Sequence, residues 1–182
     1  MTTDDPTADL RTVHLLEIPL SVYARSTQHF EELMREFALI SLDTDREAAA
    51  DGGSRPVPER LQTLVHELTE NFSAFTVDTE AERDAALARG ESTIDLTYRI
   101  PPQVTGASRE LSALLEEVDD YCRAGQHLIT LATPPESVAF RAWYLDEFIG
   151  QLEQGRDPMP WDEYVARNHA DAEWARDQLP SG

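Results

Sequence analysis

Four stretches of the chain repeat apolar residues at the three- and four-residue spacing of an amphipathic helix. They span residues 21–42, 58–75, 107–124 and 133–152. Two weaker helical patterns, at 78–89 and 161–178, follow the second and the fourth stretch. The sequence therefore predicts five or six helices, four of them long.

One segment carries the period of a strand instead. Residues 93–100, TIDLTYRI, alternate strictly between apolar and polar, which is typical of a half-buried strand. Its obvious partner is the apolar segment at residues 12–18. Two arrangements stay open at this point: a two-stranded pairing, or an extended strap that lies over the helices.

The stretch 133–152 is expected to be the central helix, because it is apolar on most sides. Thr133, Pro134 and Glu136 suggest its start: a cap, a proline at the first helical position and a capping box. Its broad apolar face consists of Val138, Ala142, Leu145, Phe148, Ile149 and Leu152. Phe140, Trp143 and Tyr144 extend the apolar surface around the back.

Arg141 interrupts this apolar face between Phe148 and Leu152. A guanidinium in that position requires a carboxylate and further acceptors, so we predict a buried ion pair. The alternative is that the stem of Arg141 crosses the apolar surface and its charged end reaches water.

We expect a mostly α-helical single domain, with the four long helices approximating an antiparallel bundle and at most a minor two-stranded β element. The domain would span residues 11–178, with a disordered N-terminus at 1–10, a mobile connection at about 43–57 and a tail at 179–182. We expect one undivided core. Its predicted positions include Leu33, Phe37, Leu64, Leu68, Leu114, Val118, Leu145 and Ile149, whereas Glu116, Glu117, Asp119 and Asp120 are placed on the outer or flanking surface.

Charge and composition argue against several classes of function and location. The net charge is −20, and all fifteen basic residues other than histidine are arginine, which argues against general nucleic-acid binding. No window approaches 18 unbroken apolar residues, and the acidic N-terminus lacks the apolar region of a secretion signal. The single cysteine, Cys122, excludes an intrachain disulfide and suits a reducing compartment. We therefore expect an acidic cytoplasmic protein that contacts neither membrane nor nucleic acid.

The chain carries no intact catalytic motif. HExxH, GxSxG and GxGxxG are absent, and a phosphate-cradling GxxxxGK[ST] loop is impossible without lysine. We therefore predict no enzymatic activity, no cofactor and no metal. Cys122 lies on the apolar stripe of a helix, so we interpret it as an inert thiol packed in the core. His29 lies at the edge of the apolar face of 21–42, where a polar rim is preferred over a ligand or a proton switch.

His66 is the best candidate for chemistry. His66, Glu67 and Leu68 resemble the start of the phospho-acceptor box of histidine kinases, in which an exposed histidine is phosphorylated and an adjacent acid can act as a base. That box continues Arg-Thr-Pro-Leu, whereas this chain continues TENF, so a surface histidine beside acids is the alternative. Glu67 and Asn71 resemble the N-box of the kinase ATPase fold, but its other boxes are missing.

Three longer phrases carry a resemblance to a protein group. They are QHFEELMREFALI at 28–40, DDYCRAGQHLITLATPPE at 119–136 and AFRAWYLDEF at 139–148. In these phrases the chain resembles a set of actinobacterial helical proteins encoded near partner-switching regulators, namely ATP-binding anti-sigma kinases, STAS-domain antagonists and PP2C-type phosphatases. The resemblance covers about residues 12–161. It implies no catalytic residue, because the group has no assigned activity.

The first functional hypothesis is a non-enzymatic regulator in signal transduction that binds another signalling protein, such as an anti-sigma kinase or a STAS-type antagonist. Its acidic charge favours a basic patch on the partner. The second is a histidine phosphotransfer bundle, a homodimer through its first two helices, with His66 as acceptor. The third is a small-molecule sensor with a pocket near Trp143 and Tyr144.

Overall fold

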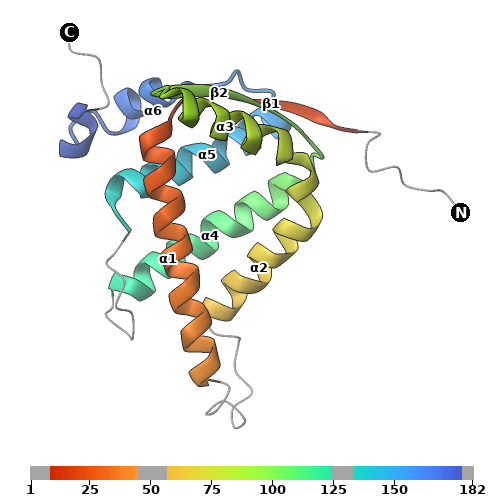
Figure 1. Cartoon of the computed structure of the whole chain (residues 1–182), viewed down its shortest axis with the longest axis vertical. Helices are drawn as coiled ribbons and strands as arrows, with labels where there is room; N and C mark the ends of the chain where they lie inside the picture. The colour runs from red at the N-terminus through yellow and green to blue at the C-terminus, as the bar shows by residue number, and fades with distance from the viewer. Residues whose placement is uncertain (1–8, 45–56, 124–132, 178–182) are drawn as a thin grey trace, which may run out of the picture.

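The computed structural model describes residues 9–44, 57–123 and 133–177. Within these ranges the chain forms six α-helices and one two-stranded sheet (Figure 1). The elements are β1 (Arg11–Pro19), α1 (Leu20–Thr44), α2 (Val57–Phe72), α3 (Val77–Arg89), β2 (Thr93–Ile100), α4 (Val104–Arg123), α5 (Pro135–Gln154) and α6 (Trp161–Asn168). Short 3₁₀ helices follow α2 at Ser73–Phe75 and α6 at Glu173–Asp177. The predicted mostly α-helical fold with a minor β element is confirmed. Apart from the residues at their edges, the predicted disordered N-terminus, mobile connection and tail lie outside the described residues.

The two strands pair antiparallel, so the strap alternative is wrong. Val13 lies opposite Tyr98, and Leu15 lies opposite Leu96. All four side chains are buried, because the alternation of β2 turns its apolar positions to one face. The register shifts between Leu15 and Ile18. Within this bulge Glu17 has a φ of 54°, and its backbone N–H donates to Asp95 Oδ1 at 2.7 Å.

The four long helices form a ring. Helix α1 contacts α2 and α5, and α4 contacts the same two helices. In Figure 1, α1 runs away from the sheet and α2 returns toward it, after which α4 runs away and α5 returns beneath the sheet. The predicted bundle is thus present, with the sheet and α3 covering one end. None of the described helices is long and apolar enough to cross a membrane.

The buried apolar side chains form two clusters where we expected one core. The sheet cluster joins β1, β2, the start of α1, α5 and α6, and it includes Val13, Leu15, Leu96, Phe140, Trp143 and Trp161. The bundle cluster joins α1, α2 and α4, and it includes Leu33, Phe37, Leu61, Leu64, Leu114 and Val118. Three predicted core positions, Leu68, Leu145 and Ile149, are only partly buried.

Helix α5 is rotated relative to the prediction. Phe140 and Trp143, expected at the back, are buried against the sheet and α6, whereas Ala142 is exposed. A helix that is apolar on most sides does not specify its rotation, so the position of the sheet decides which side is covered. The predicted capping box is wrong as well. The structure gives this helix no side-chain cap, and Glu136 Oε2 instead accepts from Arg25 Nη2 at 2.6 Å.

The end of the chain departs from the prediction of one final helix over 161–178. Helix α6 ends at Asn168, and the chain then turns into the 3₁₀ helix at Glu173–Asp177. The turn brings Trp174 back onto Trp161, with ring centroids 6.2 Å apart. Stacking of the aromatic rings is possible only because the helix stops.

Candidate functional site

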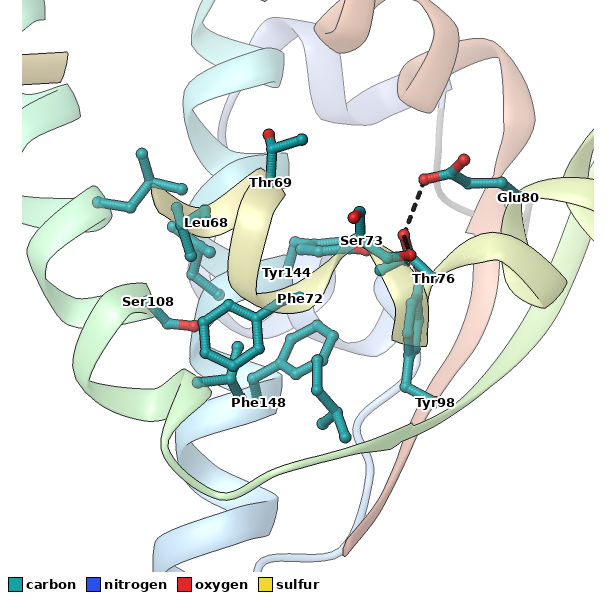
Figure 2. A pocket seen from close by; sticks show the side chains of 14 residues that line it. Leu68, Thr69, Phe72, Ser73, Thr76, Glu80, Tyr98, Ser108, Tyr144 and Phe148 are labelled. Carbon is teal, nitrogen blue, oxygen red and sulfur yellow. Dashed lines mark hydrogen bonds between the residues drawn. The ribbon is translucent and has the colours of Figure 1, made fainter. Parts of the chain in front are cut away.

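Two cavities lie between the sheet cluster and the bundle cluster. The first, here the α1–α5 cavity, has a volume of about 270 Å³ and is lined by α1, α4 and α5. The second, here the α2–β2 cavity, has a volume of about 300 Å³ and is lined by α2, α3, β2, α4 and α5 together with the segment after α2 (Figure 2). Leu111, Tyr144 and Leu145 line both cavities, so these side chains form the wall between them.

The α1–α5 cavity is apolar on most sides. Its apolar lining consists of Phe30, Leu33, Leu111, Leu115, Phe140 and Leu145. Its polar lining includes Ser26, His29, Thr133, Ser137 and Arg141. A small apolar cavity with a few polar groups is the usual form of a small-molecule site.

An ion pair links α4 to α5 beside this cavity. Arg141 Nη2 donates to Asp119 Oδ2, and the two side chains are 19% and 8% exposed. Arg141 Nη2 also lies 3.5 Å from the backbone oxygen of Leu115. Asp119 is therefore the carboxylate that Arg141 requires, and its predicted place on the outer or flanking surface of 107–124 is wrong.

Thr133 extends this pair toward α1. Its hydroxyl Oγ1 donates to Asp119 Oδ1 at 2.6 Å, and His29 Nε2 lies 3.1 Å from the same Oγ1. A hydroxyl carries one proton, which Thr133 gives to Asp119. His29 must therefore donate its Nε2–H to Thr133, which fixes the neutral tautomer with the lone pair on Nδ1. Thr133, expected to cap α5, instead orients this histidine.

The environment of His29 favours its neutral form. Burial lowers the pKa of His29 below its ordinary value of 6.5, and the positive charge of Arg141 acts in the same direction. Glu32, Asp119 and Glu36 act in the opposite direction without reversing the shift. The imidazole is thus presented to the cavity without a charge at neutral pH.

Ser26 lies three residues before His29 and lines the same cavity. Its Oγ is buried and has no hydrogen-bond partner in the part of the chain that the structure describes. An unpaired buried hydroxyl costs about 1–3 kcal/mol, so such groups are rare in folded proteins. The α1 side of the cavity therefore presents a polar group whose partner is missing.

The phenols around the wall are already paired. Tyr144 Oη lies 2.8 Å from Tyr98 Oη, and burial raises the pKa of both hydroxyls. Tyr23 accepts from Arg83 Nη1 at 2.9 Å. At the mouth of the α2–β2 cavity, Thr76 Oγ1 donates to Glu80 Oε1 at 2.9 Å (Figure 2). These groups already bind one another, so they offer a ligand no unpaired donor or acceptor. The α1–α5 cavity, with its unpaired Ser26 hydroxyl, is therefore the better candidate for a binding site.

The structure places the predicted phospho-acceptor residues apart from both cavities. The His66 side chain is 72% exposed on α2 and lies 3.3 Å from Glu70 Oε1, while Glu67 is also exposed. Trp143 lines neither cavity, because it is buried in the sheet cluster and its Nε1 donates to Met159 O at 2.9 Å. Tyr144, the other residue expected near a pocket, lines both. Cys122 is partly buried, and burial raises the pKa of its thiol.

Sequence reasoning missed Ser26, Thr133 and Asp119 as residues of one site. Asp119 follows the core position Val118 and lies four residues after Leu115, so its helical position was compatible with burial. Ser26 and Thr133 have no comparable pattern, because only the packing of α1 against α5 brings them to one cavity. Within residues 9–44, 57–123 and 133–177, the His, Cys, Asp and Glu side chains form no group of three that could hold a metal ion.

The chain was also compared with known proteins. Comparison with protein-family models, with curated proteins and with solved structures gives no match to any of them. The resemblance to proteins encoded near partner-switching regulators thus remains a prediction from the sequence phrases.

Proposed function

We propose that this chain is a cytoplasmic, non-enzymatic regulatory protein that senses a small molecule in the α1–α5 cavity. The observation that carries the proposal is the cavity of about 270 Å³, with apolar walls and with the unpaired Ser26 hydroxyl beside His29. A ligand with an apolar body and a polar end would fill the space and satisfy the hydroxyl.

The polar groups suit binding better than catalysis. Asp119 is engaged by Arg141 and Thr133, and Thr133 is engaged by His29. Charges that neutralise each other in this way hold side chains in place, whereas a general acid or base needs a free proton-transfer path to the substrate. This supports a binding protein as the proposed class.

The position of the cavity supports regulation. The cavity lies between two buried clusters, and its walls come from α1, α4 and α5. A ligand there would contact both clusters and favour the arrangement in which they are packed together. The partner would be another signalling protein, for which an anti-sigma kinase or a STAS-type antagonist remains the candidate. The net charge of −20 would accelerate association with a basic surface.

The test is thermal unfolding with four small probes that share an apolar body: 1-octanol, octanoate, octylamine and ethylbenzene. A probe that binds only the folded chain stabilises it by about 2.7 kcal/mol at 100 times its Kd, or a rise in Tm of roughly 5–10 °C. Ser26→Leu should abolish that rise, because it removes the unpaired hydroxyl and places a larger side chain in the α1–α5 cavity beside His29. Ser108→Leu is the matched control, because Ser108 lines the α2–β2 cavity. The proposal is wrong if no probe raises the Tm, or if only Ser108→Leu abolishes the rise.

Phosphotransfer through His66 is the second candidate, favoured by the exposure of its imidazole on α2. It would require a histidine kinase or its equivalent as phosphate donor. Acid-labile phosphate on the wild-type chain, absent from His66→Gln, would support this function. A chain recovered from cells without a phosphate-sized mass increase would argue against it.

A further inference from the structure

We infer that the ligand of the α1–α5 cavity is an uncharged amphipathic molecule whose head is a hydroxyl or an amide, bound between His29 and Ser26. This inference rests on the proposed function and adds the chemical class of the ligand. It follows from three properties of the cavity: the hydrogen-bonding groups left over at its α1 side, the balance of charge around it, and its volume.

The hydrogen-bonding groups specify a donor on the ligand. The proton of Thr133 Oγ1 goes to Asp119, so the Nε2–H of His29 goes to Thr133 and Nδ1 keeps its lone pair. The structure records the hydrogen bond of the His29 ring at Nε2, and in this inference the lone pair of Nδ1 is left for the ligand. Ser26 precedes His29 by three positions, so both lie on the same side of α1. A hydroxyl can donate to Nδ1 and accept from Ser26 Oγ, and an amide can do the same with its N–H and its oxygen.

The balance of charge disfavours an anionic head, and the cost of desolvation disfavours either ion. The charge of Arg141 is met by Asp119 at the cavity, and Glu32 and Glu36 lie close enough to His29 to act on its titration. A carboxylate placed beside Ser26 would face these three acids within a chain of net charge −20. The same acids would attract an ammonium, so a cationic head is disfavoured only by the nearby Arg141 and by the loss of hydration. Because either ion would also lose its hydration on entering an apolar cavity, a neutral head binds best.

The volume sets the size of the ligand. About 270 Å³ is the space of roughly nine water molecules in the liquid, which corresponds to on the order of ten non-hydrogen atoms. The tail would contact Phe30, Leu33, Leu115 and Phe140, which are apolar and come from all three helices around the cavity. Primary alcohols of about eight carbons meet these requirements, as do alkylated phenols and short-chain amides.

The experiment compares three probes of one chain length, 1-octanol, octanoate and octylamine, by calorimetric titration at pH 7.5. We expect 1-octanol to bind at least about 10-fold more tightly than either ion. Loss of one hydrogen bond through Ser26→Ala or through His29→Leu should weaken 1-octanol by about 3- to 10-fold each. Gln28→Ala, on the exposed side of the same helix, is the control and should leave the affinity unchanged.

A spectroscopic readout makes the test independent of variant folding. In the free wild-type chain, nitrogen chemical shifts of His29 should show a protonated Nε2 and an unprotonated Nδ1, and 1-octanol should shift the Nδ1 resonance selectively. Equal or tighter binding of octanoate that is still abolished by Ser26→Leu would overturn the ligand class and leave the sensor function standing. Binding of none of the three probes would overturn the inference, and failure of ethylbenzene as well would overturn the sensor function. A His29 resonance that is unchanged by bound 1-octanol would also overturn the inference.

Discussion

Arg156 Nη2 lies 2.6 Å from Oε1 of Glu147, a carboxylate whose side chain is only 1% exposed. The other oxygen of Glu147 accepts from Gln151 Nε2 at 2.8 Å and from the backbone N–H of Met159 at 3.1 Å. The guanidinium also reaches Asp146 Oδ2 at 2.7 Å. These contacts attach the segment before α6 to the middle of α5, beside the aromatic residues of the sheet cluster.

The first prediction concerns this buried carboxylate. Arg156→Ala should lower the free energy of unfolding by about 3–5 kcal/mol, because it leaves the charge of Glu147 buried without its counterion. Adding Glu147→Gln to that variant should recover at least about 1 kcal/mol, because the amide keeps hydrogen-bonding capacity and removes the charge. Urea unfolding at pH 7 measures both values. Arg167→Ala, which removes an exposed pair with Glu163, is the control and should cost less than about 1 kcal/mol. A Glu147→Gln substitution that recovers nothing would contradict the explanation.

The second prediction concerns the ion pair beside the cavity. Arg141→Ala should cost about 3–5 kcal/mol in urea unfolding, because it strands Asp119, whose side chain is 8% exposed. Arg109→Ala is the matched control, since Arg109 pairs with Glu153 at an exposed position. A loss below about 1 kcal/mol for Arg141→Ala would mean that the pair behaves as a surface pair.

Much of the backbone was predictable from periodicity. The strand at 93–100 has the same bounds in the structure, and α2 and α4 bury the apolar stripes that their patterns define. The spacing of apolar residues along the chain predicts these elements, because each has one clear apolar face. The rotation of α5 was not predictable, because its apolar residues surround most of the helix and the covering sheet joins strands that are distant in sequence.

The candidate site was less predictable for a related reason. Arg141 was visible from the sequence because a charge stands out on an apolar helix, but Asp119 was hidden among four acids within the five residues 116–120. Ser26 and Thr133 are common residue types in unremarkable positions. A cavity is space left by imperfect packing between elements, and no spacing along one chain segment encodes it.

The third prediction is a pH dependence of stability that arises from His29. Its pKa is lowered by folding, so between 6.5 and the folded-state value the unfolded chain binds more protons. His29 therefore leaves stability unaffected above about pH 7 and lowers it as the pH falls below 6.5, until the folded histidine is also protonated. Urea unfolding from pH 5 to 8 should show a shallower loss of stability in His29→Gln than in wild type. His66→Gln, which removes an exposed imidazole, is the control. The same change of slope in both variants would refute the assignment to His29.

The fourth prediction uses the wall between the two cavities. Leu145 lines both, so Leu145→Ala should join them into one longer space at a cost of about 2 kcal/mol in stability. The two extra methylenes of 1-decanol would then contact the apolar lining of the α2–β2 cavity. At about 0.8 kcal/mol per buried methylene, 1-decanol should gain up to roughly 15-fold in affinity relative to 1-octanol in the variant, and little in wild type. Calorimetric titration of both alcohols gives this ratio.

The control is Ile149→Ala. Ile149 is a partly buried residue on α5 that lines neither cavity, so its substitution should leave the ratio at its wild-type value. An unchanged ratio in Leu145→Ala would contradict this prediction, because it would mean that removal of Leu145 does not open the α2–β2 cavity to the tail.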